Sequence, residues 1–124
     1  MKLIIAGSRT ITNPELLEKA MIASKFAQEE LEEIISGGAK GVDTLGELWA
    51  TKHNVPIKRF PADWDKHGKG AGPIRNKKMA EYVGASGGLL ALWDGASPGT
   101  NHMMFVAKSL GLRVKVYKPK SKGK

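Results

Sequence analysis

The chain has 124 residues, 41% of them hydrophobic, and a formal net charge of +8. This length suits one domain with its own core, and the absence of cysteine excludes disulfides, thiolate zinc sites and cysteine nucleophiles. No apolar run reaches the ~18 residues of a membrane span, and the first one is too short for a signal peptide. We therefore expect a soluble, cytoplasmic protein without a membrane partner.

The positive charge is concentrated near the end of the chain. Seven of the 20 basic residues follow Asp94, and no acidic residue does. Residues 118–124 alternate lysine with proline, serine and glycine, so we predict a disordered tail after a folded domain of residues 1–117. Such a tail is able to bind nucleic-acid phosphates in a salt-sensitive way, although a solvated end without a partner is the simpler interpretation.

Strand-like and helix-like segments alternate along the folded part. The apolar run 2–6 predicts a buried strand, and Asn13 followed by Pro14 predicts a helix that extends to about residue 28. The pattern then predicts, in chain order, strand 32–36, helix 42–53, strand 56–60, a helix from residue 73, strand 87–93, a helix ended by Gly111, and strand 113–117. The polar segment 61–72 is long for a connection and is typical of a loop that serves a site.

This alternation predicts an α/β protein with a doubly wound, five-stranded parallel sheet, because parallel strands need helical crossovers. Ligands of such sheets bind beyond the carboxyl ends of the strands, near the switch in strand order. Four loops should converge there, formed by residues 7–9, 36–43, 63–75 and 94–100.

Residues 36–43 form the most informative of these loops, because they follow a strand and precede a helix. Glycines at 37, 38 and 41 allow a tight turn whose backbone N–H groups approach a ligand, and the following helix N-terminus favours a phosphate. The spacing matches neither the P-loop nor the dinucleotide-binding pattern. A tight strand-to-helix turn without a ligand is the alternative.

The converging loops combine hydroxyls, glycine N–H groups and cations, which suits an anionic ligand. Arg75 is expected in the first turn of its helix, where its guanidinium can hold a phosphate through two hydrogen bonds. The aspartates favour a nucleotide, because they could accept hydrogen bonds from its ribose hydroxyls or base amine. Each aspartate is equally explained as a helix cap or turn residue. The candidate ligand-binding residues are Gly7, Ser8, Arg9, Ser36, Gly37, Gly38, Lys40, Gly41, Asp43, Asp63, Trp64, Lys69, Arg75, Asn76, Asp94, Gly95, Ser97, Gly99 and Thr100.

Two further interpretations concern single residues. Trp64 would either stack on a base or anchor the long loop to the body of the protein. Phe105 lies opposite the apolar face of its helix and would be exposed or part of an interface, from which we predict a homodimer. No nucleophilic triad or histidine-rich cluster is present, so we assign no catalytic residue and expect no metal and no required cofactor, only a nucleotide-type ligand.

Five separated motifs resemble the YspA/YpsA-related branch of the SLOG superfamily. They comprise residues 7–9, 37–43, 61–64, 68–76 and 99–103, and together they span nearly the whole chain except the lysine tail. The resemblance implies a Rossmann-like three-layer fold that binds nucleotides or nucleotide-derived ligands, often in homodimers. It also implies a bacterial or phage setting.

A more distant resemblance, carried by Arg75, Met79 and residues 97–100, is to the lonely guy phosphoribohydrolases. Those enzymes have glutamates two and three residues after the loop threonine, where this chain has His102 and Met103. A nucleotide-processing N-glycosidic hydrolase would therefore need Asp63 or Asp94 as its carboxylate. Nucleic-acid binding is a third alternative, supported by the basic tail and by a superfamily resemblance to DNA-processing protein A.

Overall fold

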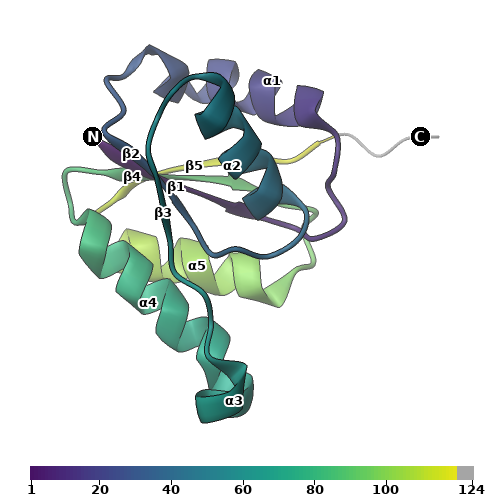
Figure 1. Ribbon diagram of the computed structural model, residues 1–124, viewed down its shortest axis with the longest axis vertical. Coiled ribbons are helices and arrows are strands. Elements are labelled where there is room, and N and C mark those ends of the chain that lie inside the picture. Colours follow the sequence, from purple (N-terminus) through teal and green to yellow (C-terminus); the bar gives the residue numbers. More distant parts are fainter. Residues whose placement is uncertain (120–124) are drawn as a thin grey trace.

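The computed structural model describes residues 1–119, which form a single five-stranded parallel sheet between two layers of helices (Figure 1). The strands are β1 (Lys2–Gly7), β2 (Glu33–Ser36), β3 (Ile57–Arg59), β4 (Gly88–Leu92) and β5 (Arg113–Tyr117). The helices are α1 (Pro14–Ser24), α2 (Val42–Lys52), the short α3 (Trp64–His67), α4 (Ala71–Val83) and α5 (Pro98–Ser109), with 3-10 turns at Phe26–Gln28 and Gly68–Gly70. The predicted fold class, a Rossmann-like three-layer α/β fold, is confirmed.

Each face of the sheet has its own apolar core. Alternate residues of β1 point to opposite faces, so Leu3 and Ile5 join the core beneath α1 and α2, while Ile4 and Ala6 join the core beneath α4 and α5. Figure 1 shows these helix pairs on opposite sides of the sheet. The continuous apolar runs of β1 and β4 follow from this burial on both faces.

The strand order β3-β2-β1-β4-β5 places the change of direction between β1 and β4. The chain first adds strands outward from β1 to β3, then returns to the other side of β1 for β4 and β5. The loops after β1 and β4 therefore leave the sheet toward opposite helical layers, which opens a crevice at the carboxyl edge. The register of β1 with β4 ends at Gly7 beside Leu92, so both loops begin at the same level.

The helix boundaries differ from the sequence prediction at two points. The helix predicted to reach residue 28 ends at Ser24, because Lys25 adopts a left-handed conformation with φ of 68°. The helix predicted to start at Pro73 starts at Ala71, since Gly70 and Ala71 are already helical. Pro73 still lies in the first turn, where its missing N–H leaves no hydrogen bond unmade.

Two other sequence predictions concern membrane spans and the C-terminal tail, and the structure describes the chain only as far as residue 119. No helix within residues 1–119 is long and apolar enough to cross a membrane. Lys118 and Pro119 follow β5, and Lys118 Nζ lies 5.8 Å from the centre of the Trp93 ring. Residues 120–124 of the predicted tail lie outside the described residues.

Candidate functional site

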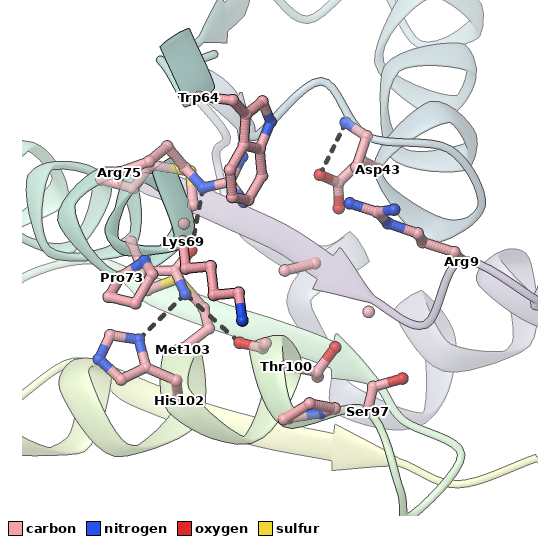
Figure 2. Close-up of a pocket in the computed structure, with 18 of the residues that line it drawn as sticks. Arg9, Asp43, Trp64, Lys69, Pro73, Arg75, Ser97, Thr100, His102 and Met103 are labelled. Atoms are coloured by element: carbon pink, nitrogen blue, oxygen red, sulfur yellow. Dashed lines mark hydrogen bonds between the residues drawn. The ribbon is translucent and has the colours of Figure 1, made fainter. Parts of the chain in front are cut away.

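A pocket of about 550 Å³ opens at the carboxyl edge of the sheet, where the crevice between β1 and β4 was expected (Figure 2). Helices α3, α4 and α5, the end of β1 and the loop before α2 surround it. The lining residues are Ala6, Gly7, Arg9, Thr10, Ala39, Asp43, Trp64, Lys69, Gly72, Pro73, Arg75, Asn76, Met79, Ser97, Pro98, Gly99, Thr100, His102 and Met103. Three of these side chains are cationic and a single one is a carboxylate, so the pocket favours an anion.

The end of β1 joins the two loops that flank it. Gly7 has no space for a side chain, because a Cβ there would lie 2.1 Å from the Leu92 carbonyl oxygen and 2.8 Å from a Val42 methyl group. The buried Ser8 hydroxyl accepts the Asp94 N–H at 3.0 Å and the Ser97 hydroxyl at 3.1 Å. Ser8 therefore holds the loop after β4 in place, while its exposed neighbour Arg9 lines the pocket.

The loop between β2 and α2 is stabilised from within. The buried Ser36 hydroxyl donates to Glu47 Oε2 at 2.7 Å and accepts the Gly38 N–H at 3.0 Å. Gly41 has a φ of 78° and packs so closely on the loop after β1 that a Cβ would lie 2.5 Å from the Ser8 carbonyl oxygen. Lys40 is exposed and does not line the pocket. Gly41 thus serves close packing of the backbone, whereas Gly38, with a φ of 75° and open space around it, serves the turn itself.

Asp43, in the first turn of α2, is the one carboxylate of the lining. Its side chain is only 6% exposed, and its Oδ2 atom accepts the Ala39 N–H at 3.1 Å. Burial raises the pKa of Asp43 to about 6, because desolvation outweighs the Ala39 hydrogen bond and the attraction of Arg75 and Arg9. The Asp43 carboxyl therefore keeps its proton to a higher pH than an exposed aspartate does.

Arg75 connects α4 to the loop after β2. Its Nη1 group donates to the Gly37 carbonyl oxygen at 2.8 Å, and its Nε group donates to Asn76 Oδ1 at 3.0 Å. A Cβ on Gly37 would lie 2.3 Å from that Nη1 atom, so the guanidinium needs a glycine at this position. Burial lowers the pKa of Arg75 from its ordinary value, and Asp43 opposes this effect. Because α4 starts at Ala71, Arg75 lies in its second turn, whereas the sequence predicted the first.

Asn76 is buried beside Arg75 and binds the start of α5. Its Nδ2 group donates to the Gly99 carbonyl oxygen at 3.3 Å and lies 3.1 Å from His102 Nδ1. The two helices are thereby fixed at the edge of the pocket, where Ser97, Gly99 and Thr100 form the first turn of α5 and its N-cap. Backbone N–H groups of a first helical turn have no partner within the helix.

Trp64 and Lys69 form the outer wall. Trp64 begins α3 and remains 51% exposed, while a Cβ on Gly72 would lie 3.4 Å from its ring. The ring thus rests on the start of α4 and also borders the pocket, which agrees with both interpretations of this residue. Stacking on a base stays a prediction.

Two of the predicted aspartates do not line the pocket. Asp63 caps α3 by accepting the Lys66 N–H at 3.1 Å. Asp94 accepts the N–H groups of Ala96 and Ser97, each at 2.8 Å, and these two hydrogen bonds lower the pKa of its exposed carboxyl. Gly95 follows in the same turn with a φ of 88°. These aspartates act as the cap and the turn residue that the sequence offered as alternatives.

The structure thus brings together about half of the predicted residues and assigns the others to supporting positions. Those that line the pocket are Gly7, Arg9, Asp43, Trp64, Lys69, Arg75, Asn76, Ser97, Gly99 and Thr100. Ser8, Ser36, Gly37, Gly38, Lys40, Gly41, Asp63, Asp94 and Gly95 lie outside the lining. Sequence reasoning missed His102 and Met79 as lining residues, although His102 follows Gly99 and Met79 follows Asn76 by three residues, a spacing that puts each pair on one helix face.

Among residues 1–119, no group of three or more histidine, aspartate or glutamate side chains is arranged to hold a metal ion.

The fold and the site together define a Rossmann-like α/β protein with a cationic pocket at the carboxyl edge of its sheet. The chain belongs to the YspA, cpYpsA-related SLOG family, whose model matches residues 1–67. It is also similar to the Gene 61 protein of Mycobacterium phage D29, with 38% identity over 86 residues that cover 65% of this chain and 67% of the phage protein. No solved structure matches the chain significantly.

Proposed function

We propose that the pocket binds a nucleotide or a nucleotide-derived small molecule that contains phosphate, in order to sense, carry or sequester it. The observation that carries this proposal is the charge of the lining, with Arg9, Lys69 and Arg75 against the single carboxylate of Asp43. The volume of about 550 Å³ lies within the ~300–1,000 Å³ range of small-molecule sites. Family membership supports a ligand of nucleotide type.

The phosphate is expected near Lys69 and the first turn of α5. Lys69, Ser97 and Thr100 border the same part of the pocket in Figure 2. The unpaired N–H groups and the partial positive charge of the helix N-terminus would add to the lysine charge. The half-exposed ring of Trp64 provides an apolar surface for a base.

Binding explains the site without a chemical step. A hydrolase that uses Asp63 or Asp94 would need a carboxylate in the pocket, whereas these two side chains bind backbone N–H groups of their own segments. If the protein released a free base from a nucleotide, chromatography of the incubation mixture would detect it. That result would add a reaction to the proposed binding.

Calorimetry and thermal-shift measurements with mono-, di-, cyclic and dinucleotides test the proposal, because a ligand of the native state raises its stability. We expect binding by at least one class, weakened about tenfold or more by Arg9→Ala and by Lys69→Ala, since each removes a charge from the lining. Lys19→Ala is the matched control, because Lys19 is exposed on α1 and outside the lining. The absence of any response to the whole panel would refute the proposal.

We also propose that the protein forms a homodimer in the cytoplasm. Phe105 is 69% exposed on α5, which makes that helix the preferred interface. A dimeric mass in light scattering that Phe105→Ser converts to a monomeric mass would support this arrangement, and a monomeric wild-type protein would exclude it. Nucleic-acid binding by the basic tail stays a prediction, to be tested by truncation after Tyr117 in a salt titration.

A further inference from the structure

Asp43 has binding capacity that the protein itself does not use. Its Oδ2 atom accepts the Ala39 N–H, and among residues 1–119 no hydrogen bond reaches its Oδ1 atom. In the described part of the chain, no ion pair within 4.0 Å joins the carboxyl to Arg9 or Arg75, although both guanidinium groups favour its ionised form. A carboxyl that is 6% exposed and lines a pocket therefore keeps one acceptor oxygen for another molecule.

The position of this carboxyl is fixed before any ligand arrives. A Cβ on Gly37 would lie 2.8 Å from Oδ2, so the backbone of the loop rests directly against the carboxyl. The Ala39 hydrogen bond holds the same oxygen from another direction. Because the side chain need not be reoriented on binding, a hydrogen bond to its free oxygen contributes more to the binding affinity than one to a mobile carboxyl.

The chemistry of the carboxyl restricts which group of a ligand it contacts. An ionised carboxylate only accepts hydrogen bonds, and so does a phosphate, which it also repels. The ligand must therefore present a donor at Asp43. In a nucleotide the donors are the ribose hydroxyls and the amine and ring N–H groups of the bases.

The surrounding side chains favour the ribose hydroxyls. We expect the phosphate near Lys69 and the first turn of α5 and the base at Trp64, so the sugar that joins them lies in the middle of the pocket, whose one carboxylate is Asp43. In a nucleotide the sugar connects directly to the phosphate, whereas the base amine is at the far end of the molecule. Trp64, which belongs to α3 and not to α2, supplies a separate surface for the base (Figure 2).

We propose that Asp43 makes the pocket selective for nucleotides with an intact ribose over their deoxy forms, by accepting a hydrogen bond from one ribose hydroxyl through Oδ1. This inference rests on the proposed function, because it assigns a part of the same pocket. It adds the sugar to the description of the ligand and gives Asp43 the role of a specificity-determining residue.

The test compares the affinities for one ribonucleotide and for its 2′-deoxy and 3′-deoxy forms, by calorimetry, in the wild type and in Asp43→Asn. The wild type should bind the ribonucleotide about tenfold or more tightly than at least one deoxy form, the usual effect of one hydrogen bond to a charged group. Asp43→Asn has nearly the same shape and can retain the Ala39 hydrogen bond. It should abolish the preference by weakening ribonucleotide binding, with little change for that deoxy form.

Asp65→Asn is the matched control, because Asp65 is an exposed aspartate on α3 outside the pocket lining and should leave the preference unchanged. Equal wild-type affinities for all three sugars would overturn the inference while the proposed function stood. If Asp43→Asn lost the discrimination between adenine and hypoxanthine nucleotides and kept the discrimination between sugars, the inference would be overturned in favour of a base contact. Failure of every nucleotide to bind would instead refute the proposed function.

Discussion

The first turn of α2 and the loop after β4 lie at the same edge of the sheet and each carry an aspartate, and their surroundings shift the two pKa values in opposite directions. Asp94 is exposed and binds two N–H groups of its own turn, which lowers its pKa. Asp43 is buried with one such N–H group, and burial raises its pKa to about 6. The difference shows that an aspartate stabilises a loop when its oxygens find local donors, and that a desolvated one left partly unpaired is a cost to folding.

The largest effect is expected where these two segments meet. Gly7→Ala would place a Cβ against the Leu92 carbonyl oxygen on one side and the buried Val42 side chain on the other, and neither can move without disturbing the sheet or α2. We expect a loss of about 3 kcal/mol or more in the free energy of unfolding, measured with urea. Gly99→Ala is the control, because no heavy atom lies within 4 Å of its added Cβ. Equal stabilities of the two variants would show that the two segments do not depend on this packing.

The next effect is a gain in stability from Asp43→Asn. The native carboxyl keeps its proton up to a pH of about 6, whereas the unfolded one loses it near 3.8, so stability falls as the pH rises between these values. Near neutral pH the variant should be more stable than the wild type by about 1–3 kcal/mol, and in acid the difference should vanish. Urea unfolding at both pH values measures this. A variant that is less stable near neutral pH would contradict the burial argument.

Asp94→Asn should lower the stability near neutral pH, in contrast to Asp43→Asn, and its effect should be the smallest of the three. The hydrogen bonds to Ala96 and Ser97 favour the ionised form, so the native pKa lies below that of the unfolded chain. Their contribution is present above the unfolded value and is lost as the pH falls through the native one. We expect a slightly lower melting temperature near neutral pH and none of this difference in strong acid. A stabilised Asp94→Asn variant would remove the contrast between the two aspartates.

Together these variants separate stability from binding. If Asp43→Asn is more stable and also loses its preference for ribonucleotides, the cost of burying the carboxyl is explained by its role in the pocket. A stabilised variant with unchanged ligand preference would leave that cost without a functional reason.

Most of the fold could be predicted from the sequence, because burial on both faces gives β1 and β4 continuous apolar runs between turn residues. The strand Arg113–Tyr117 was predicted with its observed boundaries. The end of α1 could not be, since Lys25 adopts a left-handed conformation that is unusual for a residue other than glycine. The start of α4 was missed because proline is typical of a first helical position, and here it is the third residue.

The site was predictable in its loops and less so in its side chains. Local patterns favoured caps and turns for Asp63 and Asp94 as strongly as ligand contacts. Only the tertiary structure distinguishes them from Asp43. The hydrogen bond from Arg75 to the Gly37 carbonyl joins residues 38 positions apart, and no local pattern indicates it.

The buried Asn76 has one further consequence, for the imidazole of His102. A guanidinium only donates hydrogen bonds, so Arg75 fixes the Asn76 oxygen toward itself and turns the amide nitrogen toward Gly99 and His102. His102 Nδ1 must then accept, which leaves the proton of the neutral ring on Nε2. The charge of one arginine thus selects the tautomer of a histidine on the neighbouring helix, through an amide that touches both.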